Sequence, residues 1–117
     1  MSLSQNKVLS LVGLATKAGR TVSGEFSTEK AVKSGQASLV IVSEEASDNT
    51  KKKFHNMCTY YKVPIYFFGT KVELGNAMGK EFRASMAVLD EGLGNALKKQ
   101  LDAEQNGGSQ NVKNQSS

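Results

Sequence analysis

Apolar residues alternate along the chain between helical and strand spacing. Six of them share one stripe at about 3.6-residue spacing near the N-terminus, which predicts an amphipathic helix that ends at Gly19. They are Leu3, Val8, Leu11, Val12, Leu14 and Ala15. The run Leu39-Val40-Ile41-Val42 is continuous and β-branched, which is typical of a strand buried on both faces.

The same reasoning extends to the rest of the chain. It predicts helices over about 4–17, 26–34, 48–60, 71–78 and 91–102, and strands over 21–23, 39–42, 63–68 and 85–89. Ser27 or Glu25 is expected to cap the second helix, and Asp48 or Ser47 the third. Pro64 suits the first position of a strand or a strand at the sheet edge. Because strands alternate with helices, we expect an α/β fold, a three-layer α/β/α sandwich around a four-stranded mixed sheet.

One folded domain over 1–103 follows from these elements. The remaining stretch, 104–117, reads EQNGGSQNVKNQSS and holds one apolar side chain, Val112. Such a stretch buries too little surface to offset the entropy of ordering, so a disordered polar tail is predicted.

Composition narrows the class of protein. The 117 residues contain no apolar run long enough to cross a membrane, and the N-terminus lacks the pattern of a secretory signal. Cys58 is the single cysteine, which excludes a disulfide within the chain and fits a cytoplasmic location. The formal net charge of +4 mildly favours a polyanionic partner.

The sequence gives little support for a catalytic site or a metal-binding site. His55 and Cys58 lie three apart on a predicted helix and would resemble a nucleophile with its base, or two metal ligands. A half-exposed histidine beside a packed thiol is favoured, because no second Cys or His completes a zinc set. Glu44, Glu45 and Asp48 would suit an acid and base pair, but a solvated loop and a helix cap are favoured.

The segment from Ser23 to Lys33 is the more informative candidate. Gly24 allows backbone to approach a ligand closely, and the helix that follows offers free N–H groups to a phosphate. Lys30 and Lys33 lie on one face of that helix, and Arg20 comes just before the strand. An ordinary strand-to-helix turn with solvated lysines explains this segment equally well. Lys51-Lys52-Lys53, likewise, is interpreted as a solvated face.

Several longer segments resemble a known family. GLATKAGRTVSG, AVKSGQASLVIVSEEASDNTKKKF and YYKVPIYFFGTKVELGNAMGKEFRASMAVLDEGLGNAL resemble the kink-turn-binding ribosomal protein family, which includes the large-subunit proteins numbered seven-Ae and thirty-e, and most of all its bacterial YlxQ-like branch. The resemblance covers about 8–101. Its most specific pieces are Asp48-Asn49-Thr50-Lys51-Lys52 and 74–80, LGNAMGK.

The resemblance implies a four-stranded sheet between helical layers and non-catalytic binding of structured RNA, ribosomal or otherwise noncoding. The family's Gly-x-Asn-Glu-x-x-Lys segment corresponds to 24–30 here, where Gly24 and Lys30 match but Phe26 and Ser27 replace the Asn and Glu. The family's second RNA-contacting loop, before the last strand, corresponds to Arg83-Ala84-Ser85-Met86. RNA binding therefore carries over better than recognition of a standard kink-turn, for which Phe26 would offer stacking in place of hydrogen bonds.

The sequence thus predicts an RNA-binding protein of bacterial ribonucleoprotein type, with association with the ribosome, no cofactor, no metal and no catalysis. The expected RNA-binding residues are Arg20, Gly24, Glu25, Phe26, Ser27, Lys30, Lys33, Glu45, Arg83, Ala84 and Ser85. A protein-interaction adaptor of the same fold is the alternative, if aromatic residues such as Tyr60, Tyr61 and Phe67 are exposed. A substrate-gripping domain of an RNA-modifying enzyme is the third hypothesis.

Overall fold

The computed structural model of the protein describes residues 3–107. The elements in chain order are α1 (Leu3–Lys17), β1 (Thr21–Ser23), α2 (Glu25–Lys33), β2 (Leu39–Val42), α3 (Asp48–Tyr61), β3 (Ile65–Phe67), α4 (Lys71–Ala77), β4 (Ser85–Val88) and α5 (Glu91–Gly107). No helix in this part of the chain is both long enough and apolar enough to cross a membrane. The predicted α/β fold is confirmed.

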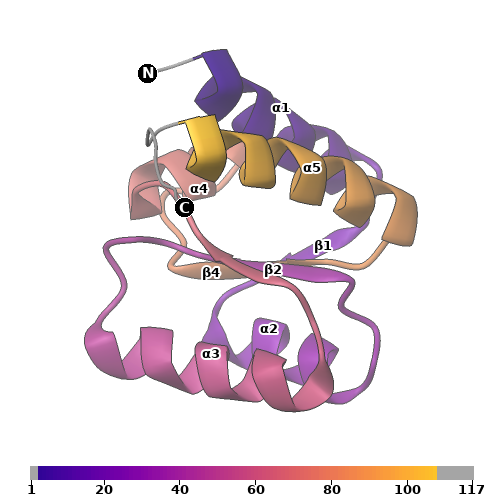
Figure 1. Cartoon of the computed structure of the whole chain (residues 1–117), viewed down its shortest axis with the longest axis vertical. Helices are drawn as coiled ribbons and strands as arrows, with labels where there is room; N and C mark the ends of the chain where they lie inside the picture. Colours follow the sequence, from indigo (N-terminus) through magenta and orange to yellow (C-terminus); the bar gives the residue numbers. More distant parts are fainter. Residues whose placement is uncertain (1–2, 108–117) are drawn as a thin grey trace.

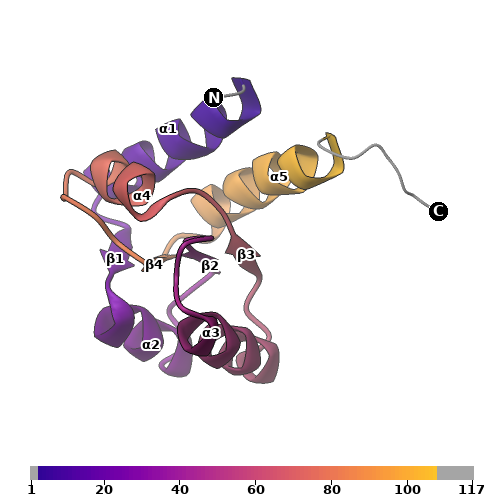
Figure 2. The ribbon, with the colours of Figure 1, turned by 90° about the vertical axis from the view of Figure 1, so that its left-hand side faces the viewer.

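The helices form two layers on opposite faces of the sheet. Figure 1 shows α1, α4 and α5 on one face and α2 and α3 on the other, and the turned view in Figure 2 shows the same division. The strand order is β1-β4-β2-β3. β2 and β3 are parallel, whereas β4 is antiparallel to both of its neighbours, β1 and β2, so the sheet is mixed as expected.

The two central strands divide the hydrophobic core in two. Every residue of β2 and β4 is buried. Since side chains alternate between the two faces of a strand, Leu39 and Ile41 pack beneath α1 and α5, while Val40 and Val42 pack against α2 and α3. β1 and β3 lie at the edges and are less buried, and Pro64 precedes the edge strand β3, as its chemistry requires.

Helix caps explain where most helices begin. The Oγ of Ser47 accepts the N–H of Thr50, so Ser47 caps α3 in place of Asp48, and the Oδ2 of Asp90 accepts the N–H of Leu93 at the start of α5. The expected cap of α2 was wrong. Gly24 occupies the cap position with no side-chain hydrogen bond, and Glu25 and Ser27 lie within the first turn.

Three boundaries or burial states differ from the prediction. Leu14 is 57% exposed, because the core side of α1 is already filled by Val8, Val12 and Ala15. β3 has three residues in place of six. α5 continues to Gly107, so the predicted tail does not begin at 104; residues 108–117 lie outside the described part of the chain.

A hydrogen bond between β3 and α5 ties the edge strand to the helical layer. The Oη of Tyr66 donates to the Oδ1 of Asp102 at 2.6 Å, and the Nζ of Lys98 lies 3.1 Å from the Oδ2 of Asp102. The hydrogen bond from Tyr66, and then that from Lys98, lowers the pKa of the Asp102 carboxyl below its ordinary value.

We expect Tyr66→Phe to destabilise the protein by about 1.5 kcal/mol at pH 7, because it removes a hydrogen bond to a charged acceptor. The folded-state pKa of Asp102 lies below its unfolded value. The stabilisation is therefore complete above the unfolded pKa and is lost as the pH falls through the folded one. Urea unfolding at pH 7 and pH 3 should show the difference between variant and parent shrinking at pH 3. Tyr60→Phe, at an exposed ring, should match the parent at both values. A constant difference would disprove the role of Asp102.

Candidate functional site

Most of the predicted site residues lie along the side of the sheet where strands β1, β2 and β3 end, and not along its border strands. The C-terminal ends of β1, β2 and β3 and the beginning of β4 meet there, because β4 runs antiparallel to its neighbours. The helices that follow the first three strands, α2, α3 and α4, therefore all begin at this edge, which we call the helix-start edge (Figure 2). Three helix N-termini place three positive dipole ends together.

The beginning of α2 is open. Gly24 adopts φ 91° and ψ 159°, and its N–H donates to the carbonyl of Ser85 at 2.9 Å, which joins β1 to the start of β4. The first return bond of the helix runs from Thr28 N–H to the Gly24 carbonyl. Within residues 3–107, the N–H groups of Glu25, Phe26 and Ser27 have no acceptor, since no side chain caps this helix. These donors suit an anion.

The starts of α3 and α4 are capped by side chains, in contrast to that of α2. Ser47 caps α3, and Thr70 with Glu73 forms a reciprocal capping box at α4. The Oε1 of Glu45 also accepts the N–H of Lys71 at 3.0 Å. Glu45 thus lies at the helix-start edge, where its carboxylate accepts a hydrogen bond from the backbone of the same chain. Of the three helix starts, that of α2 is the one where no side chain accepts an N–H group of the first turn.

The loop before β4 is fixed beside Gly24. Arg83 donates from Nε to the Oγ of Ser23 at 2.9 Å and from Nη1 to the Phe82 carbonyl at 2.8 Å. A guanidinium has five N–H donors, so others remain for a ligand. The Ala84 carbonyl accepts the N–H of Ser43, and Ser85 is 1% exposed. The Ser85 side chain is therefore buried beneath the surface of the helix-start edge.

A ladder of charges links α2 to α3. The Nζ of Lys53 lies 2.8 Å from carboxylate oxygens of both Glu25 and Glu29, and Glu29 also contacts the Nζ of Lys33 at 2.7 Å. The hydrogen bonds from Lys33 and then Lys53 lower the pKa of Glu29 to about 2. Glu25 and Lys33, both predicted to bind RNA, are therefore already paired. The lysine run 51–53 is also divided, since only Lys53 joins the ladder.

Lys30 and Phe26 remain available on the outside of α2. Phe26 is 78% exposed, and no ion pair within residues 3–107 involves Lys30. The two residues are four apart and line a shallow hollow of about 420 Å³ together with Glu29, Lys33 and Ser34. An exposed aromatic ring beside a free cation, next to open backbone donors, suits a base attached to a phosphate.

Two exposed apolar side chains at the same edge were missed by the sequence reasoning. Phe82 is 57% exposed and Val72 is 54% exposed, and the loop that carries Phe82 is bonded to α4 from Arg83 N–H to the Lys71 carbonyl. An aromatic residue directly before Arg83, in a predicted loop, was the available signal for Phe82.

Two predicted residues lie away from the edge. Arg20 precedes β1, and its carbonyl accepts the N–H of Leu89 beyond the far end of β4. One three-residue strand separates it from Gly24, about 13 Å at strand rise. Lys33 ends α2, about 13 Å from Gly24 at helical rise. Arg20 and Lys33 are close to Gly24 in the sequence, but β1 and α2 place them far from it in the structure.

His55 and Cys58, considered as a nucleophile with its base, differ in their exposure. His55 is exposed, whereas Cys58 is fully buried, and burial raises the pKa of its thiol to about 11. A thiol in this state is a poor nucleophile near neutral pH. No group of three His, Cys, Asp or Glu side chains within residues 3–107 is placed to hold a metal ion.

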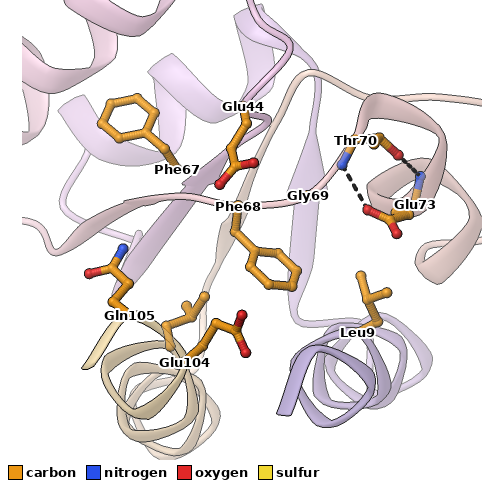
Figure 3. Close-up of a pocket in the computed structure, with 10 residues that line it drawn as sticks. Leu9, Glu44, Phe67, Phe68, Gly69, Thr70, Glu73, Glu104 and Gln105 are labelled. Carbon is orange, nitrogen blue, oxygen red and sulfur yellow. Dashed lines mark hydrogen bonds between the residues drawn. The ribbon is translucent and has the colours of Figure 1, made fainter. Parts of the chain in front are cut away.

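A cavity of about 390 Å³ lies on the opposite side of the sheet, between α1, α5 and the start of α4. Figure 3 shows Phe68 pointing between α1, which carries Leu9, and α5, which carries Glu104. Three carboxylates line the cavity, from Glu44, Glu73 and Glu104. A phosphate would meet like charge here, so the open start of α2 is the better anion site.

Comparison with known proteins gives a consistent result. Residues 6–99 match the model of the family described as "Ribosomal protein L7Ae/L30e/S12e/Gadd45 family". The "RNA-binding protein YlxQ" of Bacillus subtilis (strain 168) is 44% identical over 92 residues, which cover 79% of this chain and 92% of that protein. The "Large ribosomal subunit protein eL30" of Tetrahymena thermophila is 35% identical over 98 residues, covering 82% and 94%. A solved structure described as a protein with unknown function from Bacillus halodurans C has a TM-score of 0.80 at 41% identity, and the match covers 82% of this chain and 97% of that one.

Proposed function

The chain belongs to the ribosomal protein L7Ae/L30e/S12e/Gadd45 family, and from that premise we propose that it binds structured RNA without catalysis, in the cytoplasm and in association with the ribosome. The observation that carries the proposal is the uncapped start of α2, where three backbone N–H groups lie open beside Gly24. The names of the relatives support the same partner, since one is called RNA-binding and another is a ribosomal protein.

The RNA backbone is held by charge and by backbone donors. A phosphate at the start of α2 accepts from the N–H groups of Phe26 and Ser27 and is favoured by the positive end of the helix. Lys30, one turn along, neutralises it or its neighbour. The free N–H donors of Arg83 take a second phosphate or the edge of a base.

We expect this chain to recognise bases by stacking, whereas the family uses hydrogen bonds from an Asn and a Glu side chain. Phe26 stands where the family has Asn, and its ring is 78% exposed, so it stacks on an unpaired base. Ser27 has a single hydroxyl where the family has Glu, so it forms at most a short-range hydrogen bond. Phe82, at the same edge, supports a second base. The preferred RNA therefore has splayed bases, as at a kink, but is recognised without the polar pair that the family uses on a standard kink-turn.

Filter binding over a range of salt concentrations tests the proposal. We expect the protein to bind a kink-turn hairpin or a ribosomal RNA fragment more tightly than random-sequence RNA of equal length. Lys30→Ala should weaken binding and reduce the slope of log K against log salt by about 0.7 to 0.9, the loss of one phosphate contact. Lys99→Ala, an exposed lysine of α5 in the opposite layer, is the matched control and should change neither quantity. Binding no tighter than to random RNA at moderate salt would refute the function.

A further inference from the structure

The exposed face of α3 carries a second set of polar and aromatic groups that the proposed site does not use. Asn49, Lys52, Asn56 and Tyr60 are spaced three, four and four residues apart, so they share one side of the helix. All four are exposed, and we call this set the α3 outer face. It is about 16 Å long at helical rise.

The charge of this face is unpaired. Lys53 is held in the ladder with Glu25 and Glu29, but no ion pair within residues 3–107 involves Lys52. Lys62, directly after the helix, is likewise without one and is exposed. Asp48 is the one carboxylate in α3, and it lies at the first position, beside the helix-start edge. The rest of the face is complementary to a polyanion.

The aromatic end of the face is prearranged. Tyr60 is 79% exposed, yet its ring packs edge-to-face against Tyr61 with centroids 4.9 Å apart. Tyr61 fixes the orientation of Tyr60 while leaving most of the ring open. A fixed, exposed ring is a stacking platform for an unpaired base. The amide of Asn56, one turn before, can donate to and accept from a base edge.

The α3 outer face is continuous with the helix-start edge, because α3 begins there and runs parallel to α2 (Figure 1). On the basis of the proposed function, we propose that the α3 outer face is a second RNA contact, which binds a strand flanking the RNA held at the helix-start edge. Lys52 contacts a phosphate of that strand, and Tyr60 stacks on one of its bases. At about 3.4 Å per nucleotide, the face spans about five nucleotides.

The test compares short and lengthened RNAs. The probes are a kink-turn hairpin with minimal arms and hairpins in which each arm in turn gains ten unpaired nucleotides. The wild-type protein should bind one lengthened RNA more tightly than the short one. Tyr60→Ala should weaken binding to that RNA about 5- to 150-fold, the range for one stacked base, and leave the short RNA unaffected. Lys52→Ala should reduce the salt slope for the lengthened RNA by about one phosphate contact.

Two controls separate a direct contact from loss of structure. Tyr60→Phe keeps the ring and should bind both RNAs as the parent does. Lys99→Ala removes an exposed lysine from the opposite layer and should change neither affinity. Equal wild-type affinity for short and lengthened RNAs would overturn the inference. So would an equal loss for both RNAs in Tyr60→Ala, or a Tyr60→Ala variant that binds every RNA normally but loses a nuclease-resistant protein partner.

Failure of the proposed function has a different signature. In that case the wild-type protein binds the short hairpin no better than random RNA. If a lengthened RNA still binds, and this binding requires Tyr60 and Lys52, the α3 outer face remains an RNA contact. The helix-start edge is then not an RNA-binding site. If no RNA binds, both proposals fall.

Discussion

Replacing Gly75 by alanine is expected to lower the free energy of unfolding by about 3 kcal/mol, at the upper end of the usual cost of overpacking. A β-carbon at this position would lie 2.4 Å from the Cα of Phe82 and 2.6 Å from its backbone N. Both neighbours are backbone atoms, so no side chain can rotate away. The melting temperature should fall by roughly 10 to 20 °C for a domain of this size.

The displaced segment also belongs to the candidate site. The hydrogen bonds that tie the loop after α4 to the helix include those from Lys80 N–H to the Gly75 carbonyl and from Arg83 N–H to the Lys71 carbonyl. Where the variant still folds, Arg83 should be displaced and RNA affinity reduced. Asn76→Ala, at the exposed neighbouring position of α4, is the control and should change stability by less than about 0.5 kcal/mol. Thermal unfolding of Gly75→Ala that coincides with the parent would contradict this packing.

The second large effect is expected on binding. Gly24→Ala should weaken RNA binding by roughly 10- to 100-fold, because the backbone at φ 91° and ψ 159° is essentially restricted to glycine. Alanine would relax this conformation and turn the N–H groups of Phe26 and Ser27 away. Each charge-assisted hydrogen bond lost costs about 1.5 to 3 kcal/mol. Apart from the two chain neighbours of Gly24, no heavy atom of residues 3–107 lies within 4 Å of the added methyl group, so the methyl would enter the space open to a phosphate.

Gly35→Ala provides a control for strain. Gly35 follows the other end of α2, has φ 79°, and also has open space around its α-carbon. Alanine at either position should cost about 1 to 2 kcal/mol of stability through the left-handed backbone. Only Gly24→Ala should affect RNA. If filter binding shows the same loss for both variants, the effect is one of stability, and Gly24 has no direct part in binding.

Much of the fold could be predicted from the sequence because it follows from local patterns. The apolar run 39–42 indicates a strand buried on both faces, and it forms the central strand β2. Pro64 suits the first position of a strand or an edge strand, and it directly precedes the edge strand β3. Leu14 was misjudged because a stripe read at 3.6-residue spacing is wider than the surface that the sheet covers. The end of α5 was misjudged because polar residues continue a helix without an apolar pattern to mark it.

The candidate site was harder to predict, because it depends on which charges are already paired. Lys30 and Lys33 look equivalent in the sequence, but Glu29 pairs with Lys33 and leaves Lys30 free. Glu45 looks available, but its carboxylate bonds the N–H of Lys71 across a gap of 26 residues. The absence of a cap on α2 also depends on side-chain geometry, since Ser27 is too far into the helix to serve.

Because β4 lies between β1 and β2 in the sheet, the sheet cannot be completed during synthesis until β4 has been made. β1 has β4 as its sheet neighbour, and Thr21 faces Val88, so the first strand emerges from the ribosome long before its partner. The Gly24 N–H donates to Ser85 and the Ser43 N–H to Ala84, so the helix-start edge waits for the same strand. A nascent chain that has not yet reached residue 85 thus lacks both the complete sheet and the carbonyl to which the Gly24 N–H donates. The chain therefore gains its proposed RNA site only after β4 has been synthesised.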